Sequence, residues 1–349
     1  MKQTATLILI ISSGLFLALF TRCTEKEDTD EMEIFPPGRV FSEMVYDGTR
    51  KRVVLFGGLR EEFAEVGNSN NLLLYLNDTW EYDGTVWSET ISTVNPPTRY
   101  GAGMAFDQQR SVVVLYGGRD TSERSLDDLW EYTGTVWEKR TGFGDNYGDK
   151  PGRKAFPIMT YFPEEMSTVM MVGSQTDDMW FYDGQVWILT EIIVPTPIRF
   201  SFQARSVYDS NREKLILHSG RDLGYGDTYE LQGNSWEPIA SRHDPESRFS
   251  FGMIYDPNRD VLVLFGGQSC RKVQESDSQC QRIPLNDTWE FDGENWYVVE
   301  PRQSPPARYG HAMAYDESRG VTVLFGGMGE NGTTLNDTWE YDGVTWTQR

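Results

Sequence analysis

The chain has 349 residues, of which 33 are glycines and 13% are aromatic, and its formal net charge is −21. Sequence-independent nucleic-acid binding needs lysine and arginine to neutralise phosphates, so this acidic composition excludes that class of partner. The many glycines and aromatic residues favour short strands and tight turns over a helical fold.

The first segment is typical of an export signal. Lys2 precedes an apolar run, Leu7–Phe20, which is shorter than the roughly 20 residues that a membrane-spanning helix needs. We therefore expect residues 1–22 to be a signal peptide and the acidic residues 23–35 to be a flexible tether. Cys23 lies where a bacterial lipoprotein carries its lipid, so three interpretations stay open: a lipoprotein, a free secreted or periplasmic protein, and an uncleaved anchor.

A repeated pair of aromatic residues, seven positions apart, organises the rest of the chain. The pairs are Trp80 and Trp87, Trp130 and Trp137, Trp180 and Trp187, Tyr229 and Trp236, Trp289 and Trp296, and Trp339 and Trp346. These positions contain all 11 tryptophans of the chain. The pattern predicts six copies of one structural unit, at about residues 36–94, 95–150, 151–194, 195–243, 244–303 and 304–349.

Each copy is expected to contain four strands, which we name A to D. In the last copy, alternation after Arg308 and the apolar run VTVLF predict strands A and B, and DTWEY and VTW predict strands C and D. Asp316 begins the A–B turn, and Asp342-Gly343 forms the C–D turn. The double glycine Gly326-Gly327 ends strand B, where the backbone is tightly packed or has a positive φ.

Together these motifs resemble the kelch repeat, and the resemblance covers residues 36–349. It implies an all-β, six-bladed kelch-type β-propeller with four antiparallel strands per blade, of a bacterial exported or lipoprotein type. Blades 3 and 4 depart from the motif, with Val172-Gly173 and Ser219-Gly220 in place of the double glycine and Tyr229 in place of a tryptophan. We expect both blades to keep their strands.

The two sides of such a ring differ. The short A–B and C–D turns emerge on one side, which we call the turn face, and the B–C loops and D–A connections emerge on the other, which we call the loop face. Every long segment (59–77, 138–152 and 268–286) belongs to the loop face, where the resemblance implies partner recognition. Our candidate ligand-binding residues there are Phe63, Asn70, Asn71, Tyr75, Phe143, Tyr147, Arg271 and Lys272.

An arginine opens strand A of every copy, and an aspartate opens every strand C. The arginines are Arg39, Arg99, Arg153, Arg199, Arg248 and Arg308. They either form a cationic ring that holds an anion or pair with the aspartates. Repetition in all six copies favours pairing, because an asymmetric ligand rarely needs six equivalent contacts.

Two cysteines and three histidines are the remaining candidates for a disulfide or a metal site. Cys270 and Cys280 share one loop, and an exported protein is expected to join them in a disulfide. The resemblance extends to copper oxidases of this fold, but His218, His243 and His311 are scattered along the chain and do not supply their ligand set. We expect no cofactor, no metal and no catalytic residue.

The sequence therefore predicts a non-catalytic binding scaffold at the cell envelope, which recognises a protein or a glycan through its loop face. Two alternatives stay open: an enzyme that acts on a carbohydrate in the central pocket, and a structural spacer in an envelope assembly.

Overall fold

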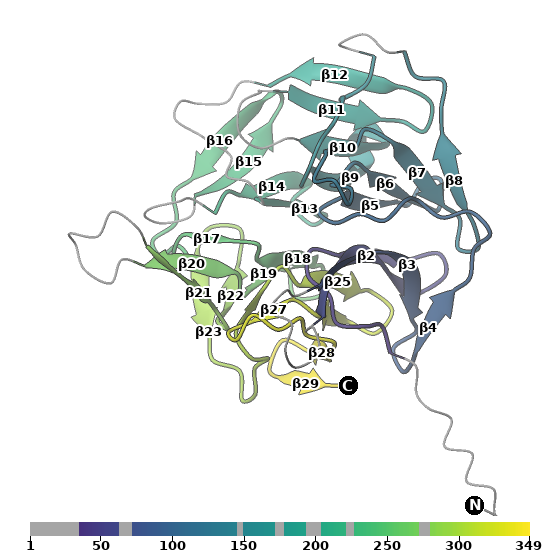
Figure 1. Cartoon of the computed structure of the whole chain (residues 1–349). Coiled ribbons are helices and arrows are strands. Elements are labelled where there is room, and N and C mark those ends of the chain that lie inside the picture. The colour runs from purple at the N-terminus through teal and green to yellow at the C-terminus, as the bar shows by residue number, and fades with distance from the viewer. Residues whose placement is uncertain are drawn as a thin grey trace, which may run out of the picture. The chain divides into compact units, whose positions relative to one another are not determined.

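The repeats form six four-stranded antiparallel sheets in the computed structural model. The structure describes residues 35–62, 72–144, 149–171, 178–192, 204–220, 227–271 and 280–349, all within one unit, Ile34–Arg349. Each sheet is one blade, and the blades follow one another in chain order (Figure 1).

Blades 1 to 4 each use four consecutive strands. Blade 1 contains β1 (Glu43–Asp47), β2 (Arg52–Glu62), β3 (Leu72–Tyr82) and β4 (Trp87–Thr90). Blade 2 contains β5 (Gly103–Asp107), β6 (Val112–Tyr116), β7 (Leu129–Tyr132) and β8 (Trp137–Arg140). Blade 3 contains β9 (Ile158–Phe162), the 3-10 helix η1 (Pro163–Glu165), β10 (Ser167–Met171), β11 (Asp178–Tyr182) and β12 (Trp187–Glu191).

The last two blades carry additional short strands on the loop face. Blade 4 contains β13 (Arg205–Asp209), β14 (Lys214–His218), β15 (Thr228–Gln232) and β16 (Ser235–Ile239). Blade 5 contains β18 (Gly252–Asp256), β19 (Val261–Phe265), β22 (Thr288–Phe291) and β23 (Trp296–Val299), with β17 (Arg248–Phe249), β20 (Gln268–Arg271) and β21 (Gln281–Pro284) beside it. Blade 6 contains β25 (Ala312–Asp316), β26 (Val321–Phe325), β28 (Thr338–Tyr341) and β29 (Trp346–Gln348), with β24 (Arg308–Tyr309) and β27 (Met328–Gly329) beside it.

The hydrophobic core lies between the blades. Between blades 1 and 2, for example, Val54 and Phe56 of β2 pack against Trp137 in one buried cluster. The indole N–H of Trp137 donates to the hydroxyl of Thr79 in blade 1, at 2.8 Å. The second tryptophan of a repeat thus joins its blade to the preceding one, which accounts for its strict spacing in the sequence.

The ring closes between blade 6 and blade 1 without exchange of a strand. The inner strands β1 and β25 are in contact, as are the inner strands of the other neighbouring blades. Across this junction, which we call the seam, the indole N–H of Trp87 donates to Thr338 at 2.9 Å, and Tyr82 donates to Glu340 at 3.1 Å. The predicted six-bladed propeller with four antiparallel strands per blade is therefore confirmed, and blades 3 and 4 keep their strands.

The buried arginines pair with aspartates, as predicted, in blades 1, 2, 5 and 6. In blade 6, Arg308 contacts both carboxylate oxygens of Asp337 at 2.7 and 2.8 Å and also donates to Gly326 O. The same carboxylate accepts the indole N–H of Trp339. Equivalent pairs are Arg39 with Asp78, Arg99 with Asp128, and Arg248 with Asp287.

The assignment of Arg153 to this set was wrong. Arg153 is exposed, and the next residue occupies the equivalent place, because Lys154 N–H donates to Leu126 O as Arg308 N–H donates to Leu285 O. The one-residue difference follows from the backbone register, which the spacing of arginines does not reveal. The remaining member, Arg199, lies outside the described residues.

Two predicted loops are partly strands. The segment 59–77 was predicted as a loop, but β2 continues to Glu62 and β3 begins at Leu72, after a register shift at Phe56/Gly58. The segment 268–286 likewise contains β20 and β21, which pair with each other. Both hairpins extend from the loop face, because the strand pairs continue beyond the double glycine that ends strand B elsewhere.

One buried histidine predicts an acid sensitivity of the fold. Burial lowers the pKa of His218 from 6.5 to about 3, so the side chain stays neutral in the folded protein while the unfolded chain binds a proton below pH 6.5. The stability from this residue is therefore complete above pH 6.5 and falls as the pH drops, by about 1.4 kcal/mol per pH unit. The equivalent residue in blades 5 and 6 is phenylalanine, at Phe265 and Phe325.

His218→Phe is expected to remove this dependence. Between pH 6.5 and pH 5, denaturant unfolding should show the wild type losing about 2 kcal/mol more than the variant. His311, which stays in both proteins, is also buried with a lowered pKa, so the variant should keep part of the acid sensitivity. Parallel pH profiles of the two proteins would contradict a buried neutral His218.

Candidate functional site

The channel through the ring is lined by equivalent residues of the six inner strands. The first layer, nearest the loop face, contains Glu43, Gly103, Ile158, Arg205, Gly252 and Ala312. The second layer contains Met44, Met104, Met159, Ser206, Met253 and Met313. The fourth layer, next to the A–B turns, contains Tyr46, Phe106, Tyr161, Tyr208, Tyr255 and Tyr315. Most of these side chains enclose a cavity of about 250 Å³.

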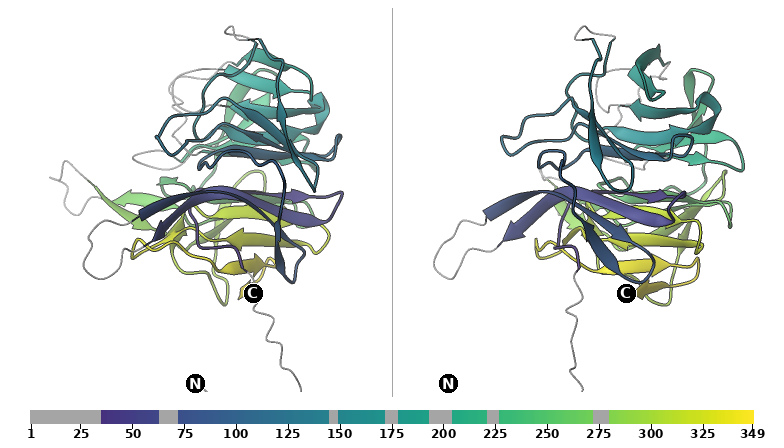
Figure 2. Two further views of the ribbon diagram at one scale, coloured as in Figure 1. Left: turned by 45° about the vertical axis from the view of Figure 1, so that its right-hand side comes forward. Right: turned by 90° about the vertical axis from the view of Figure 1, so that its right-hand side faces the viewer.

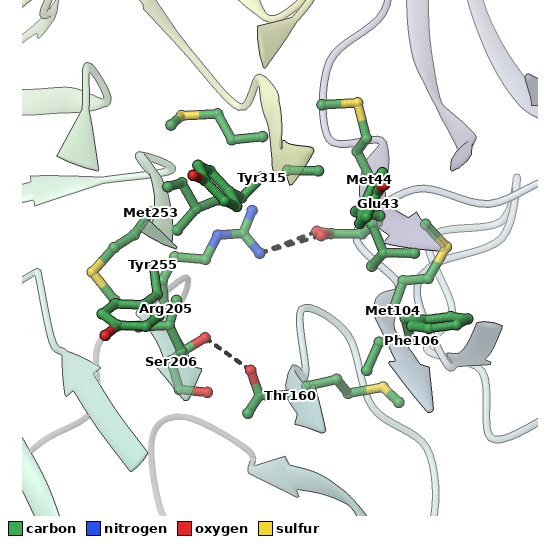
Figure 3. Close-up of a pocket in the computed structure, with 18 of the residues that line it drawn as sticks. Glu43, Met44, Met104, Phe106, Thr160, Arg205, Ser206, Met253, Tyr255 and Tyr315 are labelled. Atoms are coloured by element: carbon green, nitrogen blue, oxygen red, sulfur yellow. Dashed lines mark hydrogen bonds and ion pairs between the residues drawn. The ribbon is translucent and has the colours of Figure 1, made fainter. Parts of the chain in front are cut away.

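Two opposite charges meet across this cavity. Arg205 of blade 4 and Glu43 of blade 1 extend toward each other, with methionines around them (Figure 3). The Arg205 Nη1 atom lies 3.2 and 3.4 Å from the two carboxylate oxygens of Glu43. These contacts are longer than the 2.7 to 2.8 Å contacts of the Arg308–Asp337 pair, so the channel pair is the looser of the two.

The surroundings of the channel pair disfavour the charged form of Glu43. Burial raises the pKa of Glu43 more than the neighbouring Arg205 lowers it. The Arg205 Nε atom donates to Phe251 O at 3.3 Å, and its Nη2 atom makes no hydrogen bond to another described residue. Both charged groups thus have hydrogen-bonding capacity left inside the cavity.

Further polar atoms lie on the cavity wall. The Ser206 hydroxyl is buried and forms no hydrogen bond with any described residue, while Thr160 donates to the Ser206 carbonyl at 3.1 Å. His311 lines the cavity and packs edge-on against Phe265. Burial holds the pKa of His311 well below its usual range, and neither ring nitrogen has a well-aligned hydrogen bond within the described residues. His311 is a neutral wall residue.

The tyrosine layer surrounds the opening on the turn face. Tyr46, Phe106, Tyr161 and Tyr208 are partly exposed, whereas the methionines of the second layer are buried. Two hydroxyl groups contact the A–B turn of the preceding blade: Tyr315 accepts from Asn258 at 2.9 Å, and Tyr46 accepts from Ser318 N–H at 3.3 Å. These contacts orient the rings around the opening.

The loop-face end of the channel is narrowed by backbone. Five residues that precede the inner strands form a belt there, with positive φ angles between 53° and 64°: Phe41, Gly101, Phe156, Ser250 and Gly310. They form a chain of hydrogen bonds between blades, in which Gly310 donates to Ser250 O, Phe41 to Gly310 O, Gly101 to Phe41 O and Phe156 to Gly101 O, at 2.7 to 3.0 Å. Only about 10 Å³ of space lies between this belt and the Glu43–Arg205 pair. Since the aromatic residues that line the other end of the cavity are partly exposed, the main cavity opens toward the turn face.

Two of the candidate loop-face residues have described side chains, and both make contacts within the protein. Tyr75 lies on β3, packs against Tyr100 with the two rings tilted, and donates to Glu123 at 2.5 Å. Phe143 packs edge-on against Tyr182 between blades 2 and 3. Phe63, Asn70, Asn71, Tyr147 and Lys272 lie outside the described residues, as does Cys23, and only the backbone of Arg271 is described.

Cys270 and Cys280 form a disulfide, which joins the ends of β20 and β21. Within the described ranges, no group of three or more histidine, cysteine, aspartate or glutamate side chains is arranged to hold a metal ion. No helix in those ranges has the length and apolarity needed to cross a membrane.

The sequence analysis did not identify Glu43 and Arg205. Both are charged, and they occupy the first position of an inner strand. The other four blades have an uncharged residue at this position: Gly103, Ile158, Gly252 and Ala312. Finding them requires aligning the first residue of all six inner strands and knowing that blades 1 and 4 face each other across the ring.

No family model matches this chain. It is 25% identical over 301 residues to Mei4-dependent protein 6 of Schizosaccharomyces pombe, in a match that covers 74% of this chain and 41% of the relative, so the chain spans less than half of that protein's length. The solved structure of YjhT is similar to it with a TM-score of 0.63 at 12% identity, over 90% of this chain and 98% of YjhT. At that identity the likeness concerns the fold alone. Together with the closed ring of six sheets, it identifies the chain as a β-propeller.

Proposed function

We propose that this kelch-type propeller is a non-catalytic binding scaffold that recognises a protein or a glycan through its loop face. The observation that carries the proposal is a pair of arms, the β2–β3 hairpin and the β20–β21 hairpin. Both extend from the same side of the ring, in purple and green in the left view of Figure 2. They belong to blades 1 and 5, which flank blade 6.

The first arm presents apolar side chains to solvent. Beyond the register shift, β2 and β3 remain paired as far as Glu62 and Leu72. Leu72 and Leu73 are 56% and 51% exposed. Neighbouring exposed apolar residues on a projecting hairpin are a common feature of interaction sites.

The second arm is held in place at both ends. Its β20 strand pairs with β17 at the base and with β21 along its length. The Cys270–Cys280 disulfide joins the two strands near the far end. Such a constraint reduces the conformational entropy that a binding surface would otherwise lose on association.

The second candidate, an enzyme that acts on a carbohydrate in the channel, has less support. Glycosidic acid–base chemistry typically uses two carboxyl groups on either side of the scissile bond. Glu43 instead faces the guanidinium of Arg205 across the cavity. This arrangement favours holding a ligand over transferring protons to it.

We further propose that the scaffold is exported to the cell envelope and is either lipidated at Cys23 or free. The apolar run Leu7–Phe20 and the acidic segment after Cys23 support this location. Mass spectrometry of the mature N-terminus distinguishes the two forms, because a lipidated chain begins at a modified Cys23.

The loop-face proposal predicts which exposed leucines matter. A double Leu72→Asp/Leu73→Asp variant is expected to weaken binding to its partner at least about tenfold, because it places two charges in the apolar contact. The measurement is capture from envelope extracts and on a glycan array, followed by titration of the captured component. The matched control is Val344→Asp, on a C–D turn of the turn face and 61% exposed. A partner lost with Val344→Asp and kept by the double variant would overturn the assignment.

A further inference from the structure

We propose that the central channel is a separate binding site for a small zwitterion, such as a free amino acid, which enters from the turn face. Its carboxylate would bind Arg205 and its ammonium group would bind Glu43. Its entrance is on the turn face, opposite the two arms, and the proposal does not depend on the loop-face proposal.

The charges of the site select this class of ligand. Glu43 and Arg205 are 16% and 26% exposed and together carry no net charge. A ligand with only a carboxylate would compete for Arg205 and leave Glu43 without a partner, and an amine would do the reverse. Leaving one member of a desolvated pair without its partner is strongly unfavourable. A zwitterion restores an opposite charge beside each group.

A neutral sugar fits these charges less well. Its hydroxyl groups can donate to Glu43 and accept from Arg205, but they separate the two charges without replacing the attraction between them. The existing pair is loose, at 3.2 and 3.4 Å, and the Nη2 atom of Arg205 makes no hydrogen bond to another described residue. A ligand carboxylate can therefore bind at Nη2 while the ligand ammonium reaches Glu43.

The space beside the pair is specific to this chain's sequence. In the second layer, five blades contribute a methionine, and blade 4 contributes Ser206, next to Arg205. A serine takes up less of the wall next to Arg205 than a methionine would. This is the one position in the layer that departs from methionine.

The route into the site suits a cation. The aromatic rings of the fourth layer surround the opening, and an ammonium group is attracted to the faces of such rings. The methionines behind them give an apolar wall, where electrostatic interactions are stronger than in water. The main cavity, of about 250 Å³, is smaller than the pockets that hold drug-sized ligands, so it suits a small solute.

Isothermal titration of the purified full-length chain tests this proposal. The probes are glycine, alanine and glutamine, with N-acetylglycine lacking the ammonium group, ethylamine lacking the carboxylate, and glucose as a neutral polyol. We expect at least one of the amino acids to bind with a Kd below about 1 mM and N-acetylglycine and ethylamine to bind at least about tenfold more weakly. No binding by any of the three amino acids at 10 mM, about ten times that limit, would overturn the proposal, as would tighter binding of glucose.

Variants locate the site. Arg205→Gln and Glu43→Gln are each expected to weaken binding at least tenfold, whereas Glu89→Gln, which removes an exposed carboxylate from the outer strand β4, should leave it unchanged. Ser206→Met introduces the residue that the other five blades carry, and its melting temperature shows whether the larger side chain is accommodated. The folded variant should bind at least about tenfold more weakly, because its cavity is narrower next to Arg205. Unchanged affinity in a folded Ser206→Met protein would contradict the assignment.

Discussion

Replacing Arg99 by methionine is expected to lower the free energy of unfolding by about 3 to 5 kcal/mol. The Arg99 side chain is fully buried, and its guanidinium contacts both oxygens of Asp128 at 2.7 Å. It also donates to Gly117 O and Pro97 O, so it joins three segments of the chain. Methionine retains most of the side-chain volume and leaves Asp128 without its counter-charge.

The double variant Arg99→Met/Asp128→Asn should regain part of the loss, because it removes the unpaired charge. Arg153→Met is the matched control: Arg153 is exposed at the start of the next blade, and its replacement should change stability by less than about 0.5 kcal/mol. Urea unfolding measures all three. A loss below about 1 kcal/mol for Arg99→Met would show that the buried pairs do not hold the blades in place.

These pairs also predict a loss of stability in acid. Burial alone would raise the pKa of Asp337, but hydrogen bonds and charge attraction from Arg308 lower it overall, and the same holds for Asp128 and Arg99. Since the folded pKa lies below the unfolded value of about 3.9, this stability is complete above that pH and is lost as the pH falls through the folded pKa. The histidine effect, by contrast, begins near pH 6.5.

Trp87→Ala is expected to lower the free energy of unfolding by about 3 to 5 kcal/mol. Trp87 is buried at the seam, stacks on Tyr82 with ring centroids 5.0 Å apart, and packs against Phe325 of blade 6 at 5.2 Å. Alanine would leave a cavity between the first and last blades and remove the donor to Thr338. Chemical denaturation gives the size of the loss.

The matched control for the seam is Trp137→Ala, which makes the equivalent change inside the ring. Trp137 packs against Tyr132 with ring centroids 5.0 Å apart and against Phe56 at 5.1 Å, so its surroundings are nearly the same. Equal losses for the two variants indicate that the seam is as well packed as an internal junction. A large loss for Trp137→Ala with almost none for Trp87→Ala would contradict closure.

The fold was predictable because it depends on local, repeated features. The seven-residue spacing of Trp339 and Trp346 places one tryptophan on strand C and the other on strand D of the same blade, and both are buried. The aspartate of the A–B turn in every blade except blade 3 accepts nearby backbone N–H groups, as at Asp316 with Ser318 and Arg319. Such signals need only a few neighbouring residues to be recognised.

The channel was not predictable by the same means. Glu43 and Arg205 are 162 positions apart in the chain, and their contact depends on the number of blades and on the register of two strands. Register also decides that Lys154, and not Arg153, occupies the place equivalent to the buried arginines, through the backbone bond from Lys154 to Leu126. Composition and spacing identify which residues repeat, whereas register decides which of them point into the channel.

The hydrogen bond across the seam offers the most direct test of the closed ring. A double-mutant cycle with Trp87→Phe and Thr338→Val measures the coupling between these side chains, and a second cycle with Trp137→Phe and Thr79→Val measures the equivalent internal bond. The closed propeller predicts couplings of about 1 kcal/mol with the same sign in both cycles. A coupling near zero at Trp87 and Thr338, with a normal value at Trp137 and Thr79, would contradict it.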